Sequence, residues 1–424
     1  MPNTEGPAAP RVLFLADNAS SVFGGEAIIP LKYFVLLARR GRDVQLVTHE
    51  RNREALSAEF PDLIDKITFS VETKTHRWLW NIGLKLPDTI RYHIFGNLMV
   101  LLTMAQQRRI ARQKVRDGEI DLVHQPIPVS PTAPSSMYGI GVPVVIGPMN
   151  GAMVYPPGYE DFEGRASRLF VALGRPLSGL ANRLIPGKRR AALLLVANQR
   201  TRRALPKSKA PVVELVENAV DFDVWRASHD DQPSTGAFRI AFMGRLIPFK
   251  GLTQTLDALA EVKQRYPDRQ VTLDILGDGP ERDGLQAQAE RLGLSESVHF
   301  HGFKRQRECA QVLAKSDALI LATLWDCGGA VVLEAMAMGL AVIASDWGGP
   351  VDYVDDSCGI LVPPSPRDEF VPRLADAIID LASNPEKTRA MGEAGKAQVL
   401  ANFDWQRKID RMEELYRQAV EHKP

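Results

Sequence analysis

Short apolar runs of strand length recur through the 424-residue chain, and helix-length segments or polar loops lie between them. The first run is Val12–Ala16, and the second lies within residues 43–50. Between the two, apolar side chains fall at helical spacing from Ile28 to Arg40, and Gly41 gives a stop signal. The order strand, helix, strand is typical of a βαβ unit, in which the two strands are parallel.

The same pattern continues and then restarts after a polar segment. Further strand-length runs lie within residues 120–126, 143–151, 191–199 and 211–220. Residues 229–237 are polar, without periodicity, and indicate a linker. Beyond it the sequence predicts helices over 252–265 and 284–292, and strands within 239–246, 271–279, 298–303, 317–323, 341–346 and 359–364. We expect an α/β protein of two doubly wound, Rossmann-like domains with parallel sheets, over residues 1–228 and 238–402.

Composition and charge exclude several classes of protein. The chain is 45% hydrophobic and 24% charged, close to an ordinary globular protein, and its net charge is +1. No overall field therefore favours nucleic acid, and no nucleic-acid-binding module is evident. The three cysteines, Cys309, Cys327 and Cys358, have no zinc or disulfide spacing, which fits a reducing cytosol.

The sequence predicts neither a signal peptide nor a transmembrane helix. The first residues lack a basic segment followed by a long apolar core, and no run approaches the roughly 18 apolar residues needed for a span. We expect a cytoplasmic location, and the inner face of the membrane is an alternative. Residues 77–116 carry Trp78, Trp80, Tyr92 and Phe95 among many Arg and Lys and almost no acids.

This basic, aromatic segment has two interpretations. It could form an interfacial surface that meets anionic lipid. Alternatively, it is a helical hairpin of the first domain with a solvated basic face. A second basic cluster at residues 183–190 has the same two interpretations.

The loops after the strands of the second half carry the candidate chemistry, because open α/β sheets bind ligands beyond the carboxyl ends of their strands. Gly244 and Arg245 follow one strand, and Lys250 lies at the start of the next helix. The planar fork of Arg and the point charge of Lys together suit a diphosphate. Gly277 follows the next strand in the same way.

Residues 324–339, LWDCGGAVVLEAMAMG, place Asp326 and Glu334 on either side of a Gly328-Gly329 turn that opens a helix. The free N–H groups and the positive dipole end of such a helix favour a phosphate, and glycines allow its close approach. Glu334 could then accept hydrogen bonds from a ribose, and Asp326 from the hydroxyls of a sugar. The alternative is that Asp326 is only a helix N-cap and Glu334 a surface acid.

Several motifs occur in a specific order: GRLIPFKG, LGDGP, VHFHGF, DCGGAVVLEAMAMGLAVIAS, GGP and CGILVPP. Together they resemble the retaining GT-B glycosyltransferases of family 4, or group 1, which include sucrose, glycogen and phosphatidylinositol mannosyl transferases. The resemblance is strong over residues 238–405 and weaker at FGGEA, DLVHQP and VENAVD. It implies two domains facing each other across a cleft, and a terminal helix, 403–424, that crosses back onto the first domain.

The resemblance also implies roles for individual residues. In the family the second acid of the Glu-x7-Glu motif binds the ribose and the first contacts the donor sugar, which here are Glu334 and Asp326. Asp in place of the first Glu shortens the reach by one methylene group. The diphosphate pair maps onto Arg245 and Lys250, and the base-contacting loop lies near Phe303 and Lys304. The implied donor-binding residues are Gly24, Gly25, Asn150, Gly244, Arg245, Lys250, Gly277, Phe303, Gly328, Gly329, Ala330, Val331 and Glu334.

In the first domain the resemblance places Gly24 and Gly25 beside the phosphates and a histidine near the reacting carbon. His124 is the candidate, although this chain has His-Gln-Pro where the family often has His-x-His. The alternative is a packed histidine at a strand end. Asn150, in the loop after the strand within 143–151, is implied to face the cleft. The candidate catalytic residues are then His124, Asp326, Arg245 and Lys250.

The expected reaction is transfer of a hexosyl group from a nucleotide diphosphate sugar to a hydroxyl with retention of configuration. The expected acceptor is a glycan or a lipid-linked glycan in polysaccharide or glycoconjugate synthesis. The family does not use a DxD-bound metal, so Asp221-Phe222-Asp223 is not taken as a metal site, and no metal or cofactor is expected. Two alternatives stay open: a catalytically weak, transferase-like partner subunit and a GT-B-like nucleotide-sugar 2-epimerase.

Overall fold

The computed structural model of the chain describes residues 9–21, 25–84, 86, 95–162, 178–226 and 236–421. It divides into two compact units. Unit 1 comprises Met1–Ala152, Arg165–Glu217 and Lys408–Pro424, and unit 2 comprises Met153–Gly164 and Asn218–Arg407. Most of the expected linker, 229–237, lies outside the described residues.

Unit 1 is built on a parallel sheet of seven strands in the order β3-β2-β1-β4-β5-β6-β7. Its strands are short and nearly all apolar, because helices cover both faces of a parallel sheet. The strands are β1 Val12–Leu15, β2 Val44–His49, β3 Ile67–Ser70, β4 Leu122–Gln125, β5 Val144–Met149, β6 Leu193–Val196 and β7 Val212–Glu214. The helices are α1 Ile28–Arg39, α2 Arg53–Glu59, α3 Lys74–Gly83, α5 Asn97–Arg116 and α7 Gln199–Arg203.

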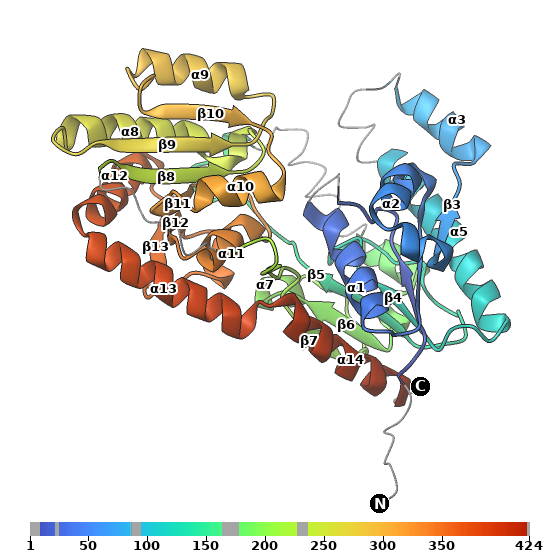
Figure 1. Cartoon of the computed structure of the whole chain (residues 1–424). Helices are drawn as coiled ribbons and strands as arrows, with labels where there is room; N and C mark the ends of the chain where they lie inside the picture. The colour runs from blue at the N-terminus through green and yellow to red at the C-terminus, as the bar shows by residue number, and fades with distance from the viewer. Residues whose placement is uncertain are drawn as a thin grey trace, which may run out of the picture. The chain divides into compact units, whose positions relative to one another are not determined.

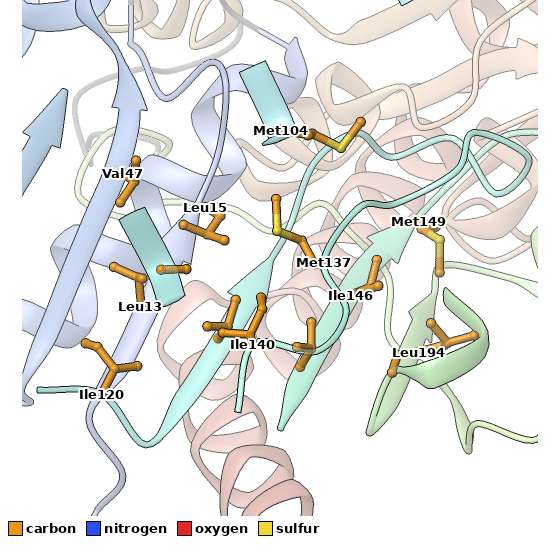
Figure 2. Close-up of a cluster of buried hydrophobic side chains, with 14 of the residues drawn as sticks. Leu13, Leu15, Val47, Met104, Ile120, Met137, Ile140, Ile146, Met149 and Leu194 are labelled. Carbon is orange, nitrogen blue, oxygen red and sulfur yellow. The ribbon is translucent and has the colours of Figure 1, made fainter. Parts of the chain in front are cut away.

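The core of unit 1 lies between this sheet and its helices. Figure 2 shows Leu13 and Leu15 of β1, Ile146 of β5 and Leu194 of β6 converging with Met104 of α5. All five side chains are buried. Burial of apolar area at about 25 cal/mol per Å² is the main term that holds such a sheet and its helices together.

Unit 2 is built on a parallel sheet of six strands in the order β10-β9-β8-β11-β12-β13. Its strands are β8 Phe238–Met243, β9 Val271–Leu276, β10 Val298–Gly302, β11 Ala318–Leu321, β12 Ala341–Ser345 and β13 Gly359–Val362. Its helices are α8 Leu252–Arg265, α9 Arg282–Arg291, α10 Gln306–Leu313, α11 Ala330–Ala337, α12 Arg367–Ser383 and α13 Pro385–Asn402 (Figure 1). The strands β8, β9 and β10 follow one another towards one edge of the sheet, and the next strand in sequence, β11, lies on the other side of β8. The topological switch point, where the strand order reverses, therefore lies between β8 and β11.

The expected α/β class with two Rossmann-like parallel sheets is confirmed. The predicted helix at 252–265 coincides with α8, and that at 284–292 begins two residues earlier, at Arg282. The division into units differs from the expected domains in three places: residues 153–162, which follow β5, and residues 218–226 and 403–407 all belong to unit 2. For residues 153–162 the physical reason is a set of contacts to the loops of unit 2, described below. The expected cleft between the domains stays a prediction.

The last helix, α14 Trp405–Glu421, belongs to unit 1 from Lys408 onward. The guanidinium of Arg42 donates to both carboxylate oxygens of Glu413, at 2.8 and 2.9 Å. The ammonium of the buried Lys408 donates to the backbone carbonyl of Val216. Burial lowers the pKa of Lys408 to about 7. These contacts join α14 to Arg42, in the loop between α1 and β2, and to Val216, just after β7.

Candidate functional site

Most of the candidate residues of the second half lie at the carboxyl edge of the unit 2 sheet. Gly244 and Arg245 follow β8, Gly277 follows β9, and Phe303 follows β10. The loop after β11 leads to α11 and carries Asp326. Because β8 and β11 flank the switch point, the loops that follow them border the place where open α/β sheets bind ligands.

Two cations lie in the loop after β8. The side chain of Arg245 is exposed and makes no ion pair or hydrogen bond with another described residue. Lys250 ends a short 3-10 turn, Pro248–Lys250, directly before α8. Its ammonium group forms a hydrogen-bonded ion pair with the Asp326 carboxylate. One cation of the expected diphosphate pair is therefore open to solvent, and the other is held by an acid.

Gly251 brings the β8 and β11 loops together. It has a φ of +71°, and a Cβ on it would lie 1.8 Å from the backbone oxygen of Ala322. No side chain fits at this position, because the backbones of the two loops already touch there. This close packing fixes Lys250, the preceding residue, over the loop that carries Asp326.

Asp326 has two partners. Its Oδ2 accepts the hydrogen bond from Lys250, and its Oδ1 accepts one from the backbone N–H of Gly329 at 3.1 Å. Gly329 is the N-cap residue of α11. Gly329, not Asp326, is therefore the N-cap residue, and the Asp326 carboxylate holds the backbone just before the helix while it lies beside a candidate phosphate-binding cation.

The start of α11 supplies backbone donors. Ala330 and Val331 are its first two residues, and both are partly exposed. The first N–H groups of a helix have no acceptor within it, and the helix dipole makes this end positive. An anion at this end of α11 would be stabilised without a metal.

Glu334 lies one turn into α11. It is partly buried, and burial raises its pKa to about 7. Its carboxyl group has no hydrogen bond or ion pair within the part of the chain that the structure describes. Since Glu334 is neither fully exposed nor paired, the interpretation as an ordinary surface acid does not fit. A carboxyl group in this state can accept hydrogen bonds from ligand hydroxyls.

Phe303 is the most exposed large apolar side chain among the described residues, with 75% of its surface accessible. It follows Gly302, the last residue of β10. The ammonium of the neighbouring Lys304 lies 3.8 Å from the Glu308 carboxylate. An exposed aromatic ring at a ligand-binding edge offers a face on which a base can stack.

The candidates of the first half lie in unit 1, and Gly24 is outside the described residues. Gly25 is exposed and opens the 3-10 turn before α1. Asn150 is buried, and its amide nitrogen donates to Glu217 at 2.7 Å. Its amide oxygen accepts from Thr201 at 3.3 Å. The side chain of Asn150 therefore serves a buried network, and the expectation that it binds the donor is not supported by its position.

His124 lies in the interior of unit 1. Its ring is fully buried at the end of β4 and packs against Phe14 and Tyr33. One ring nitrogen, Nε2, lies 2.6 Å from the carbonyl oxygen of Gly147, and Nδ1 lies 2.7 Å from the hydroxyl of Tyr416. Burial lowers its pKa to about 4.

Both nitrogens of His124 are thus used within unit 1, and the ring has no open face for a substrate. The carbonyl can only accept, so Nε2 carries the proton and Nδ1 accepts from Tyr416. This position matches the packed histidine of the alternative interpretation, and a catalytic role for His124 stays a prediction.

Sequence reasoning missed a buried lysine in unit 1. Lys188 is 1% exposed, and its ammonium donates to the carbonyls of Ser130 and Pro131 at 2.7 and 2.8 Å. Burial lowers its pKa to about 7. It lies within the basic cluster 183–190, where neighbouring Arg residues are exposed, so composition gave no signal that this one lysine is internal.

The DxD-like residues form a turn. The backbone N–H of Asp223 donates to the Asp221 carboxylate at 3.0 Å. Across the described residues, no group of three or more His, Cys, Asp or Glu side chains is placed to hold a metal ion. The same residues contain no helix long and apolar enough to cross a membrane.

The basic, aromatic segment 77–116 divides into two parts, apart from residues 85 and 87–94, which lie outside the description. In α5, Arg108 donates to the Tyr138 carbonyl at 2.8 Å and Arg112 to the Gly139 carbonyl at 2.9 Å, so these cations pack onto unit 1. In α3, Trp78 and Trp80 are 61% and 43% exposed. Both parts are helical, and α3 presents aromatic side chains to solvent, so the two interpretations of the segment stay open.

Comparisons with known proteins agree with this geometry. The model of the family described as glycosyl transferases group 1 matches residues 224–398, within unit 2. D-inositol 3-phosphate glycosyltransferase of Segniliparus rotundus is 34% identical over 43% of this chain and 40% of its own length. GDP-mannose-dependent alpha-(1-6)-phosphatidylinositol monomannoside mannosyltransferase of Mycolicibacterium smegmatis is 33% identical over 42% of this chain. That match covers 47% of the relative, so both matches span less than half the relative's length.

The fold is shared over almost the whole chain. The crystal structure of the Anabaena protein HepE in complex with UDP aligns with a TM-score of 0.68 at 18% identity, covering 96% of this chain and 99% of that one. A likeness at this identity establishes the fold alone. The expected GT-B class, with two Rossmann-like domains, is thereby confirmed.

Proposed function

We propose that this chain, whose residues 224–398 match the glycosyl transferases group 1, moves a sugar from a nucleotide diphosphate sugar to a hydroxyl acceptor. The observation that carries the proposal is the arrangement at the switch point of unit 2. The loop after β8 carries the exposed Arg245 and Lys250. The loop after the neighbouring strand β11 carries Asp326, which pairs with Lys250. That loop leads to α11, which offers its first N–H groups and carries the unpaired Glu334. Cations and helix N–H groups suit a diphosphate, and carboxylates suit sugar hydroxyls.

The roles follow from charge. Departure of the nucleoside diphosphate builds negative charge on its β-phosphate. Arg245, Lys250 and the first N–H groups of α11 would stabilise that charge as it develops. Glu334 would bind the ribose, Asp326 a hydroxyl of the donor sugar, and the exposed ring of Phe303 the base. The neighbour HepE was crystallised with UDP, which supports a nucleotide ligand for this fold.

We propose transfer with retention and without a metal. The acceptor hydroxyl would attack from the face that the diphosphate leaves, in a single step that forms no covalent intermediate with a protein side chain. The charge on the diphosphate would be met by the cations and backbone donors alone. A nucleotide-sugar 2-epimerase would use the same donor but invert C2 of its sugar, with no acceptor and with the nucleoside diphosphate retained in the product.

We further propose that the acceptor is a lipid-linked glycan reached at the cytoplasmic face of a membrane. The exposed Trp78 and Trp80 of α3, with Lys74 and Arg77 on the same helix and no acid in it, support an interfacial contact. The Mycolicibacterium smegmatis relative is named for a phosphatidylinositol mannoside, which is a lipid. A soluble glycan is the competing acceptor.

The test uses purified protein, a panel of nucleotide sugars and a measurement of nucleoside diphosphate release, with and without a lipid extract. Release from one donor that rises sharply with the extract supports transfer to a lipid-linked acceptor. Release that rises instead with soluble glycans supports the competing acceptor. If no donor releases diphosphate and none raises the melting temperature, the site is not a working donor site, and the partner-subunit alternative replaces the proposal.

A further inference from the structure

Residues 153–162, here called the strap, form a segment that follows β5 of the unit 1 sheet in sequence but folds with unit 2. Its second half is anchored near α12. The hydroxyl of Ser365 donates to the Pro157 carbonyl at 2.7 Å, and the guanidinium of Arg367 pairs with Asp161 at 2.9 Å. These contacts explain why the strap packs with unit 2, although β5, the strand that precedes it in sequence, belongs to unit 1.

The first half of the strap reaches the loop after β12. The indole N–H of Trp347 donates to the backbone carbonyl of Val154 at 2.9 Å. A Cβ on Gly348 would lie 2.8 Å from the terminal methyl of Met153, so the strap packs directly on this glycine. The side chain of Val154 itself is exposed, and only its backbone is used.

Tyr155 of the strap packs against the residue that precedes Asp326. The ring centroids of Tyr155 and Trp325 are 4.6 Å apart, at an interplanar angle of 56°. Tilted aromatic pairs at this distance contribute about 0.5–1.5 kcal/mol beyond the area that they bury. Trp325 is followed directly by Asp326, which pairs with Lys250 and accepts a hydrogen bond from the N–H of Gly329 before α11.

The backbone of Asp326 is held from the other side by the loop that the strap also contacts. The N–H of Gly349 donates to the Asp326 carbonyl at 2.8 Å. A Cβ on Gly348 would lie 2.6 Å from the same carbonyl oxygen. The strap therefore contacts two groups beside Asp326. One is the ring of Trp325, which precedes Asp326 in sequence, and the other is Gly348, which packs against the Asp326 carbonyl.

The chain enters the strap through a strained residue. Ala152 is exposed and has a φ of +60°, which costs an alanine on the order of 1 kcal/mol or more. Such a conformation persists where the contacts on both sides fix the path of the chain. Here those contacts are the unit 1 network before Ala152 and the unit 2 loops after it.

We infer that the strap is part of the donor-sugar end of the site, with Tyr155 as a positioning residue. Through Trp325 it fixes the position of the Asp326 carboxylate, and so the choice of donor sugar. This inference rests on the proposed function, in which Asp326 binds a sugar hydroxyl. Nucleotide binding by Arg245 and Glu334 does not depend on the strap.

The test compares Tyr155→Ala and Tyr155→Phe in the full chain, with the donor identified by the diphosphate-release panel. Tyr155→Ala should lower kcat at least about tenfold, because small misplacement of a positioning group is costly. It should also reduce the preference between donors that share a nucleotide, while the Kd of the nucleoside diphosphate stays within about twofold. Tyr155→Phe keeps the ring and should restore most of the rate. Leu400→Ala, at an exposed apolar position of α13 outside the strap, is the control and should match the wild type.

A second readout does not require turnover. Hydrogen exchange should be faster in Tyr155→Ala than in the wild type at residues 322–329 as well as in the strap. Faster exchange confined to the strap would overturn the positioning role, as would wild-type kcat and sugar preference in Tyr155→Ala. If Tyr155→Ala does not fold, Tyr155→Leu is measured in its place. A wild-type protein that releases no diphosphate refutes the proposed function instead, and the exchange experiment still decides whether the strap holds the Asp326 loop.

Discussion

The ammonium group of Lys250 and the carboxylate of Asp326 form an ion pair at the switch point of unit 2. Both side chains are mostly buried, with 18% and 15% of their surface accessible. The pair neutralises the charge of each partner while no anion is present. A diphosphate would compete with Asp326 for Lys250 and leave the carboxylate available to a sugar hydroxyl, which couples the two halves of donor binding.

Replacement of Lys250 tests this arrangement. Lys250→Met should lower kcat about 100-fold, or about 3 kcal/mol in transition-state stabilisation, because a preorganised charge at the leaving group is lost. The measurement is diphosphate release at saturating donor, with the melting temperature as a folding check. Lys387→Met is the matched control, since Lys387 pairs with Asp380 at 2.6 Å on the surface of unit 2. Wild-type turnover in Lys250→Met would remove Lys250 from the diphosphate site.

Glu334 predicts a pH dependence of nucleotide binding. Burial raises its pKa to about 7, so the free protein holds a mostly protonated carboxyl group below that pH. Ribose hydroxyls stabilise the ionised form, so binding lowers this pKa and affinity should rise with pH up to about 7 and then level off. The Kd of the nucleoside diphosphate, measured by titration calorimetry from pH 5.5 to 8.5, checks this.

The variant Glu334→Gln should bind more weakly at pH 8, and its affinity should lose the change centred near pH 7. Glu290→Gln, at an exposed position of α9, is the control and should keep the wild-type profile. A wild-type profile in Glu334→Gln would mean that another group titrates with the nucleotide.

The sequence predicted the sheets more completely than the contacts between loops. The helical spacing of apolar residues predicted α8 at its observed bounds, because such a spacing can be read from a short stretch of sequence. Motif order also predicted that Lys250 and Asp326 lie at one site. Their direct pairing depends on how the β8 and β11 loops meet, and the two residues are 76 positions apart.

The surroundings of His124 could not be predicted from its motif. A histidine at the end of β4 is well placed for catalysis in sequence, but its ring is covered by Tyr416, which lies 292 residues later. The strap was assigned to the first domain for a similar reason, since sequence position does not reveal onto which sheet a loop packs. Both features depend on contacts between distant segments, which no local pattern encodes.

The exposed tryptophans of α3 predict a lipid contact. The double variant Trp78→Ala, Trp80→Ala should bind vesicles containing anionic lipid at least about tenfold more weakly, because indole rings anchor helices at the interface. Binding by the wild type should weaken as salt rises, since Lys74 and Arg77 lie on the same helix.

Cosedimentation with vesicles of neutral and anionic lipid measures both effects. Leu400→Ala, an exposed apolar position on α13, is the control. Equal sedimentation of the double variant and the wild type would show that α3 does not meet the membrane.

Tyr416 should matter for stability and not for turnover. Tyr416→Phe leaves Nδ1 of the buried His124 without its partner, which should lower the free energy of unfolding by about 1–3 kcal/mol. Diphosphate release per folded molecule should stay within about twofold of the wild type. Urea unfolding at pH 7.5, followed by circular dichroism, gives the first quantity. A large loss of turnover without a loss of stability would return His124 to the list of catalytic candidates.

His124 also predicts how unit 1 responds to acid. Burial lowers its pKa to about 4, against an ordinary value near 6.5, so the unfolded chain takes up a proton that the folded chain refuses. The contribution of the neutral His124 ring to the free energy of unfolding is fully present above pH 6.5. It is lost as the pH falls towards 4, and the loss over that range is about 3 kcal/mol. Unfolding free energies measured at pH 7 and pH 5 should differ less in His124→Gln than in the wild type, because Gln does not titrate. His49, whose pKa burial also lowers, is present in both proteins and cancels in the comparison. An equal slope in the two proteins would mean that the buried ring accepts a proton without unfolding, and its bond to Tyr416 would then be able to open in the native state.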